Sequence, residues 1–505
     1  MKTTKLKIFL GVMLTLSVIS CEKYLDVNTD PNNLAKDKIT PALLMPGAMN
    51  GAHRVQSVAM NNLGNIWMQN WGGDVENFTA ANIEEYSLQI TNNFIPNIWD
   101  NIYLNVSNFQ AIIDFPSTTN DNHKAVAMIM KSYYMQYIVD LHGNAPYSQA
   151  FKGQDNLNPK YDKDVDIYRD LIVTIDKAIE TFYAADVDDE TLGNSDVMLG
   201  GNVTSWLRFA NTVKMKILLR QATLAETDAA TATYITTEFN KIIASGAGFS
   251  TTNVTINPGY SSATNLNQNP LYGTFFNNAS ATGTATQFNN FTRATDFISQ
   301  FMNGTSPATS APPLVDPRRN RLYSGSGNIS GAVQGSVTGP AVMSKVGPGV
   351  LVGHTQPGFV TSLAEVRFMI AEAKVRGYLP GGVGAALIDF NAGVAASFTQ
   401  LGAGSAVAYL SSANTKADIG WGASTNKIHA IMTQKWLATN GTNAMESYIE
   451  NVRTGFPIIP LATTALFPNR PLRLLYPTSE LVSNSANVPN VTLASIFTKG
   501  PFWAN

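Results

Sequence analysis

The chain has 505 residues, enough for one large domain or for two or three of ordinary size. Charged residues make up only 14% of it and the formal net charge is −2, so the basic surface that binds the phosphate backbone of nucleic acids is missing. A single cysteine excludes disulfides within the chain and zinc sites built from several cysteines. Such a polar, weakly charged composition suits ligands rich in hydroxyl or amide groups better than polyanions.

The N-terminus has the pattern of a lipoprotein signal peptide. Three lysines precede an apolar stretch over residues 8–19, which is shorter than the ~20 residues of a membrane-spanning helix. Val18-Ile19-Ser20-Cys21 then matches a lipobox. We therefore expect a signal peptide over residues 1–20, cleavage before Cys21 and a lipid anchor on its thiol. The alternative is an ordinary secretory signal with an incidental cysteine. No later segment is expected to be long and apolar enough to span a membrane.

Helical patterns dominate the first half of the mature chain. A polar, turn-rich leader over residues 21–39 precedes the first of them, which begins near Pro41. Further helix signals recur up to about Gly246 with short breaks. One of these helices is expected to end between Asp140 and Pro146, with Gly143 as its C-cap.

Two sets of charged residues fall on predicted helices. The helix that starts at about Trp206 carries a cationic row opposite its apolar stripe, and we expect this row to be a solvated face rather than an anion site: Arg208, Lys214, Lys216 and Arg220. Glu365 and Glu372 lie two turns apart on a later helix, where scaffold roles are favoured over the paired carboxylates of a glycosidase. Because such a pair has no diagnostic spacing, a hydrolase is not excluded on this ground.

Residues 247–358 differ from the rest of the chain. They are rich in Gly, Asn, Ser, Thr and Pro, and an irregular segment of this length in a compact domain usually has a function. One short helix is expected there, at about residues 292–302. Helical patterns return over residues 359–377, 384–401, 425–439 and 442–452, and Asn440-Gly441 joins the last two as a tight hairpin. We predict a mostly α fold, with a tetratricopeptide-like scaffold of helix pairs in one domain over residues 40–505 and a loop-rich insertion at about 247–358.

Sequence motifs of the common enzyme classes are missing. There is no G-x-S-x-G nucleophile elbow, no H-E-x-x-H motif and no Walker loop, and the five histidines are scattered. Asp186, Asp188 and Glu190 alternate like calcium ligands, but Thr191 stands where an EF-hand loop needs glycine. We therefore expect no metal and no cofactor, and the missing motifs disfavour an enzyme without excluding a hydrolase.

Several segments, taken in order and together with the lipobox, resemble the SusD/RagB family of nutrient-binding outer-membrane lipoproteins. They are residues 140–147, 206–211, 359–368, 371–373, 393–398, 431–436, 452–457 and 473–477, together with the single residues Tyr378, Glu480 and Asn484. His142 departs from this pattern, since an aromatic residue is typical of the family there.

The resemblance implies a lipid-anchored protein on the cell surface, in the outer membrane, that is not an enzyme. Proteins of this family capture oligosaccharides or peptides and deliver them to a SusC-like TonB-dependent transporter barrel. A surface glycan hydrolase remains the alternative, and a structural or adhesive surface protein is a third possibility.

Ligand capture needs aromatic faces and hydrogen-bonding groups on loops that a rigid scaffold holds. Three segments combine such residues: a turn at Gly72-Gly73, part of the loop-rich insertion, and residues 316–323. The candidate ligand-binding residues are Trp67, Asn70, Trp71, Asp74, Asn77, Tyr86, Tyr272, Phe275, Phe276, Asn277, Arg318 and Tyr323. The alternative for Trp67 is that it closes the core of the first helix, as we expect of Trp99 on the next one.

Overall fold

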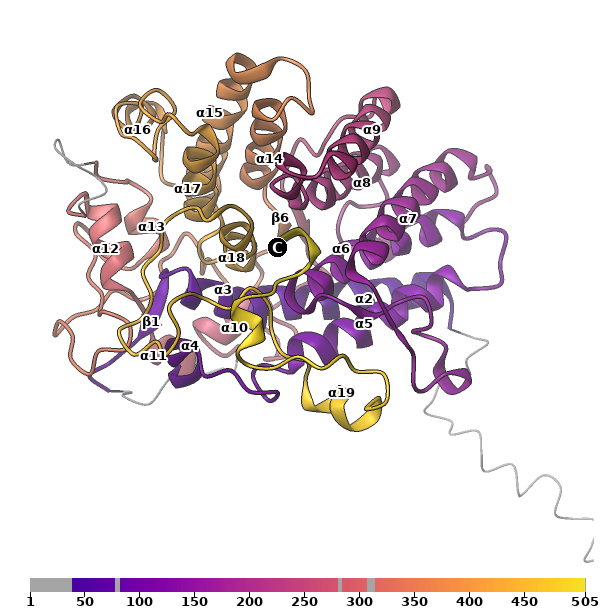
Figure 1. Ribbon diagram of the computed structural model, residues 1–505, viewed down its shortest axis with the longest axis horizontal. Coiled ribbons are helices and arrows are strands. Elements are labelled where there is room, and N and C mark those ends of the chain that lie inside the picture. Colours follow the sequence, from indigo (N-terminus) through magenta and orange to yellow (C-terminus); the bar gives the residue numbers. More distant parts are fainter. Residues whose placement is uncertain (1–38, 78–81, 280–283, 307–313, 505) are drawn as a thin grey trace, which may run out of the picture.

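The computed structural model describes residues 39–77, 82–279, 284–306 and 314–504 (Figure 1). The predicted signal peptide over residues 1–20 and the predicted lipidation site Cys21 lie outside these ranges, as does the predicted leader apart from residue 39. Within them the fold is mostly α-helical, which confirms the predicted fold class.

The helices differ widely in length. The long ones are α2 (Pro41–Val55), α5 (Asn97–Ile113), α6 (Asp121–His142), α7 (Asp164–Ala184), α8 (Val203–Arg220), α9 (Ala229–Ser245), α14 (Leu363–Val375), α15 (Gly382–Leu401), α17 (Lys427–Thr439) and α18 (Ala444–Thr454). The short ones are α3 (Asn61–Trp67), α4 (Ile83–Ser87), α10 (Pro270–Phe275), α11 (Gln287–Phe291), α12 (Asp296–Asn303), α13 (Arg319–Leu322), α16 (Val407–Ala413) and α19 (Thr478–Ser483). A π-helical segment, η2 (Gln56–Met60), joins α2 to α3, and 3₁₀ turns occur at η3 (Gly153–Asp155), η4 (Gly193–Ser195), η5 (Leu224–Glu226), η7 (Ser495–Phe497) and η8 (Phe502–Ala504).

Consecutive helices pack against one another to build the scaffold. Helix α5 packs on α2 and α6, and the series continues from α6 to α7, α8 and α9. A second group is formed by α14 with α15 and α17, and by α17 with α18. Figure 1 shows these helices fanned around the centre, with the short elements β1, α10, α11 and α12 gathered at one end. This is the tetratricopeptide-like arrangement predicted from the sequence.

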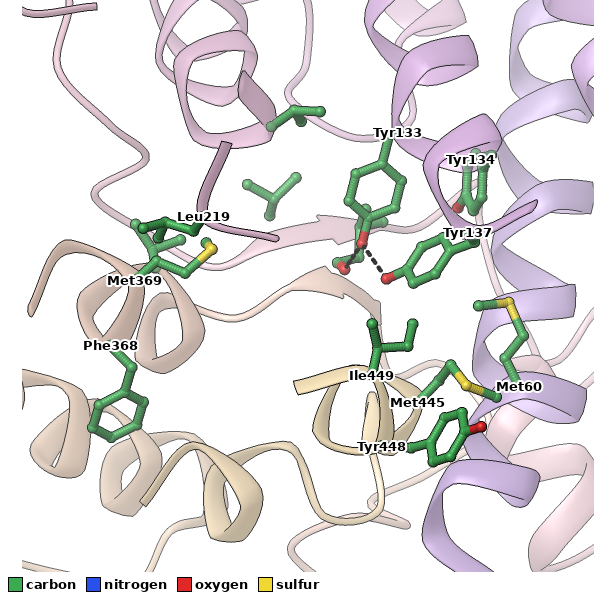
Figure 2. Close-up of a cluster of buried hydrophobic side chains, with 14 of the residues drawn as sticks. Met60, Tyr133, Tyr134, Tyr137, Leu219, Phe368, Met369, Met445, Tyr448 and Ile449 are labelled. Carbon is green, nitrogen blue, oxygen red and sulfur yellow. Dashed lines mark hydrogen bonds between the residues drawn. The ribbon is translucent and has the colours of Figure 1, made fainter. Parts of the chain in front are cut away.

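Helix α6 lies at the centre of the core, so its side chains are buried on nearly every side. Tyr133 and Tyr137 project from it, with their hydroxyls 3.2 Å apart, and the Tyr133 hydroxyl also donates to the Val360 carbonyl at 2.6 Å (Figure 2). Met60 and Met445 from two other helices lie in the same cluster. Each phenol therefore keeps a hydrogen bond inside an apolar environment, as burial of a polar group requires.

The cationic row of α8 is not a solvated face, and that prediction is wrong. Lys214, Lys216 and Arg220 are 1%, 3% and 1% exposed, and only Arg208 is half-buried. Helix α8 packs against α6, α7, α9 and α14, which leaves it no free side. Carboxylates on the surrounding helices neutralise the row: the Lys216 ammonium lies 2.8 Å from a Glu446 oxygen. The guanidinium of Arg220 contacts Asp140, Glu446 and Glu450 at 3.2, 2.9 and 2.9 Å.

The predicted scaffold roles of Glu365 and Glu372 are confirmed. Glu365 pairs with Lys216 at 3.3 Å, and Glu372 receives two bonds from the Arg453 guanidinium, at 2.7 and 2.8 Å. Burial alone would raise the pKa of Glu372, but the Arg453 and Arg376 guanidiniums hold it below its ordinary value. These carboxylates are therefore occupied by structural partners.

Two predicted helices begin as strands. In place of a helix over 292–302, the chain forms β5 (Thr292–Ala294) and then α12. In place of one starting at 359, it forms β6 (Gly358–Thr361) and then α14. The side chains of Thr295 and Ser362 cap the two helices by accepting from the backbone N–H three residues later. Helical turns thus start only after these caps, and the preceding residues are left to pair with other segments.

Those pairings fasten the loop-rich insertion to the scaffold. Strand β5 pairs antiparallel with β1 (Trp71–Gly73), with Trp71 opposite Ala294, and β4 (Val254–Ile256) pairs with β6. A third two-residue pair, β2 (Ala145–Pro146) with β3 (Tyr161–Asp162), lies between α6 and α7. The insertion is thereby held at β4 and β5, and between them Phe275 and Phe291 lie beside the β1 turn.

One helix among the described residues, α15, is long and apolar enough to cross a membrane, contrary to the expectation that no later segment would be. Its Phe390, Val394 and Phe398 are nevertheless buried in the scaffold. At Gly393 a Cβ atom would lie 2.7 Å from the ring of Phe368, so the glycine allows α14 to approach closely. The apolar face of α15 therefore has a packing role within the helix pairs.

His142 ends α6 inside a cluster of aromatic rings. Its imidazole makes an edge contact with Trp99 at 4.9 Å between centroids and stacks near Tyr476 at 6.2 Å. Neither ring nitrogen has a hydrogen-bond partner among the described residues. The side chain thus packs as an aromatic ring, which suits the position where the family pattern has one.

Candidate functional site

The structure brings residues from all three predicted ligand-binding segments together, although Arg318 of the third segment lies elsewhere. The rings of Trp71 and Phe275 lie 4.9 Å apart, and the Tyr86 hydroxyl accepts from the Gly73 N–H at 3.0 Å. Tyr323 from the third segment joins them, because its hydroxyl donates to the Asn70 carbonyl at 2.8 Å. Segments more than 200 residues apart in the sequence therefore converge beside β1. No local sequence pattern predicts this convergence.

The two tryptophans of this region have no free ring face. Trp71 is 1% exposed and Trp67 is 2% exposed. Trp67 stacks on Phe94 at 5.8 Å and contacts Tyr448 at 4.7 Å, and its indole N–H donates to the Glu85 carbonyl. The alternative interpretation of Trp67 as a core residue therefore fits this structure, and Trp71 lies behind the surface rather than on it.

Asp74 is engaged by the protein itself. Its carboxylate is 2.7 Å from the Arg293 guanidinium and also accepts from the backbone and side-chain amides of Asn77, at 3.2 and 3.1 Å. Burial and the neighbouring Arg293 lower the pKa of Lys345, whereas Asp74 opposes this shift. Asp74 and Arg293 thus form a buried pair that shapes the turn, and Asn77 remains exposed at its edge.

Arg318 belongs to a different part of the fold. It is fully buried, is paired with Asp316 at 2.7 Å, and donates to Ser397 and Gln434 at 3.1 and 3.0 Å. Burial alone would lower the pKa of Arg318, but Asp316 raises it above its ordinary value. The residue links α13 to α15 and α17, so it does not join the other candidates.

Two aromatic rings near β1 do reach the surface. Phe288 is 40% exposed and lies 5.2 Å from Phe275, which in turn contacts Trp71. Phe276 is half-buried and lies 5.0 Å from the ring of Tyr272. We call Phe276 and Phe288 the aromatic platform. Sequence reasoning missed Phe288, although the run Phe288-Asn289-Asn290-Phe291 in the insertion repeats the combination of aromatic and amide side chains that identified the other segments.

Hydrogen bonds hold the platform in place. The Phe276 carbonyl accepts from the Thr286 N–H at 2.9 Å and from the Asn289 side chain at 3.0 Å. The Asp74 N–H donates to the Phe291 carbonyl at 2.8 Å, which sets the turn of β1 beside α11. Amide side chains that stay accessible surround these elements: Asn77, Asn277 and Asn290. Together they offer ring faces and amide groups on loops that a rigid frame supports.

A cleft of about 590 Å³ lies among α5, α6 and α7, and several of its polar side chains already have partners within the protein. The Lys131 ammonium donates to Gln110 at 2.7 Å and sits 4.7 Å from the centre of the Tyr147 ring. The Tyr147 hydroxyl donates to Asp170 at 2.8 Å. Because the Lys131 ammonium covers the ring of Tyr147, this cleft is less suited than the aromatic platform to stacking on a ligand.

Solved structures show the same fold. A chitin-binding SusD homolog from Flavobacterium johnsoniae is 20% identical, with a TM-score of 0.70 over 91% of this chain and 98% of its own. A SusD homolog from Bacteroides vulgatus is 20% identical, with a TM-score of 0.68 over 88% and 92% of the two chains. A SusD/RagB family protein from Bacteroides thetaiotaomicron is also 20% identical, with a TM-score of 0.66 over 94% and 99%. None of the curated proteins matches the sequence.

The family assignment comes from the sequence as a whole. The family model SusD-like, described as starch-binding proteins associating with the outer membrane, matches residues 31–477. This range takes in the helical scaffold from α2 to β6 and beyond, the insertion that carries the aromatic platform, and the motifs near the C-terminus. The chain therefore belongs to the SusD-like family of starch-binding proteins that associate with the outer membrane.

Proposed function

We propose that this protein captures oligosaccharides at the cell surface and delivers them to a TonB-dependent transporter of the outer membrane. The observation that carries the proposal is the family match over residues 31–477, whose description combines glycan binding with the outer membrane. The lipobox at Cys21 supports a lipid anchor, which would keep the protein at that membrane. Delivery to a SusC-like barrel, rather than storage or hydrolysis, is part of the proposal.

We place the ligand on the aromatic platform. The exposed faces of Phe276 and Phe288 suit the apolar C–H faces of sugar rings, and Asn77, Asn277 and Asn290 supply donors and acceptors for hydroxyl groups. The buried candidates Trp71, Tyr272 and Phe275 support the platform from behind. Stacking of bases on aromatic residues contributes roughly 1–3 kcal/mol per ring, and we take that range as the upper scale for a sugar.

An oligosaccharide is the first ligand class to test, and a peptide is the second. Two neighbours in fold are described as chitin-binding, and the family description names starch. The low charge of the chain also suits a neutral glycan. Chito-oligosaccharides, malto-oligosaccharides and mixed peptides are therefore the probes for calorimetric titration of the wild-type protein.

The platform is tested with the best-binding probe. A Phe276→Ala/Phe288→Ala double variant should bind about tenfold more weakly, which corresponds to about 1.4 kcal/mol. Tyr183→Ala is the matched control, because this aromatic residue of α7 is 64% exposed and outside the platform. Unchanged affinity in a folded double variant would remove the platform from the site.

Two further measurements separate capture from its alternatives. Incubation of the purified protein with the same oligosaccharides should leave them intact, and release of products would favour a surface glycan hydrolase. Affinity purification from detergent-solubilised membranes should recover a large β-barrel partner. Recovery of the protein alone, under conditions that keep other barrel complexes together, would contradict delivery to a transporter.

A further inference from the structure

A pocket of about 440 Å³ lies between the start of α7 and the C-terminal segment, on different elements from the aromatic platform. Arg473, Tyr476 and Phe502 form part of its wall, and two exposed lysines, Lys163 and Lys499, stand among its lining residues. This volume is in the range of small-molecule sites, which are usually concave and partly apolar with a few polar groups.

Arg473 is the unusual member of this pocket. It is 8% exposed, and its Nε and Nη2 atoms, which are shielded from solvent, have no hydrogen-bond partner of acceptable geometry among the described residues, although the guanidinium lies close enough to Tyr476 to oppose the rise that burial causes in the pKa of its hydroxyl. The buried arginines Arg220, Arg318 and Arg453 each face at least one carboxylate within 3.2 Å. Arg473 has no such ion pair in the described parts of the chain, and its guanidinium lies 5.2 Å from the centre of the Tyr476 ring. A buried guanidinium with unmet donors is costly unless an acceptor reaches it.

The charge of the pocket favours an anion. Three cationic side chains line it, against a single carboxylate, that of Asp164. That carboxylate is already engaged, because it accepts from the Phe502 N–H at 2.8 Å and from the Val165 N–H at 2.9 Å. The lining therefore carries three positive charges and one negative charge, which is a net charge of +2.

We propose that this pocket binds a carboxylate group of a small ligand. The planar guanidinium of Arg473 matches a carboxylate with two parallel N–H donors, and Lys163 and Lys499 attract the anion from solution. Tyr476 and Phe502 supply an apolar wall for the rest of the ligand. The carboxylate could belong to a sugar acid of a glycan or to the C-terminus of a peptide. The proposal does not depend on the aromatic platform.

The test uses two carboxylate probes and their neutral counterparts. Glucuronate is compared with glucose, and N-acetylglycylglycine with its C-terminal amide, by calorimetry or ligand-observed NMR at low salt. The wild-type protein should bind at least one carboxylate probe, and should bind the neutral compounds at least about tenfold more weakly. Binding of glucuronate alone identifies a sugar acid as the source, and binding of the acetylated dipeptide alone identifies a peptide C-terminus.

Variants assign the binding to this pocket. Arg473→Gln should weaken binding of the carboxylate probe by about tenfold or more, and so should Lys163→Ala/Lys499→Ala, whose side chains are exposed. Lys177→Ala removes an exposed lysine of the same helix α7 outside the pocket and should change nothing. The proposal is overturned if neither carboxylate binds the wild type, or if the double lysine variant binds as the wild type does.

Discussion

The buried imidazole of His142 gives a prediction that separates packing from protonation. Burial lowers its pKa to about 3, and the nearby Arg473 guanidinium adds to this shift. The Leu475 backbone opposes the shift, although neither ring nitrogen has a hydrogen bond of acceptable geometry among the described residues. Replacement by phenylalanine keeps an aromatic ring between Trp99 and Tyr476 and removes the titratable group.

The magnitude follows from the two protonation states. At about pH 4.5 the unfolded chain carries a protonated imidazole, since its ordinary pKa is 6.5, whereas the folded protein keeps His142 neutral. The unfolded state then binds one more proton, so acid favours unfolding. Each pH unit below 6.5 costs about 1.4 kcal/mol, which amounts to about 2.7 kcal/mol at pH 4.5. This cost is absent above pH 6.5, grows as the pH falls and reaches its full size at about pH 3.

Urea unfolding of the wild type and of His142→Phe, followed by circular dichroism at pH 7 and at about pH 4.5, measures this difference. The free energy of unfolding should fall by about 2–3 kcal/mol less in the variant between the two pH values. Any strain from the larger phenyl ring is the same at both pH values and cancels. His53, whose pKa burial lowers to about 4, is present in both proteins and cancels as well. Equal pH dependence in the two proteins would refute the reasoning.

Four further predictions concern stability and anchoring. Gly64→Ala should destabilise the protein by about 1–3 kcal/mol or more in thermal unfolding, because the new Cβ would lie 2.2 Å from a backbone nitrogen at the start of α18. Gly47→Ala in α2, where a new Cβ would have no atom within 4 Å, should stabilise the protein by up to about 1 kcal/mol. A lower thermal stability of this variant would contradict the expected contrast between the two glycines. Arg453→Met should lower the free energy of unfolding by up to about 3 kcal/mol, because the buried Glu372 then keeps only its pairing with Arg376, and adding Glu372→Leu should restore part of it. Cys21→Ala should release the protein from membranes or leave the precursor uncleaved, whereas fractionation with the outer membrane would contradict the predicted anchor.

The helices could be predicted from the sequence because their apolar residues recur at the spacing that a packed face requires. The first pattern does begin at Pro41, and the predicted hairpin at Asn440-Gly441 does join α17 to α18. The same reasoning failed for Lys216 and Arg220. A polar face indicates solvent only when no opposite charge covers it, and Glu446, their shared partner, is more than 200 residues away in the sequence.

The candidate site was predicted at the level of segments and not of side chains. Trp71 and Phe288 both lie in segments that show no helical periodicity in the sequence, and residue type alone does not indicate which ring keeps an exposed face. The packing of β1 against the insertion decides this, since Trp71 lies buried against Phe275 whereas Phe288 stays 40% exposed. Such long-range packing has no local signal in the sequence.

The way in which the insertion is fastened has a consequence for how binding preference can change. Strands β4 and β5 hold it to β6 and β1 through main-chain hydrogen bonds, which any non-proline residue can make. The residues between Ile256 and Thr292, including the aromatic platform, are therefore framed by contacts that depend little on side-chain identity. It follows that this stretch can be exchanged between proteins of this fold: a graft joined at the two strands would give the recipient the donor's ligand preference and leave the recipient's helical frame in place.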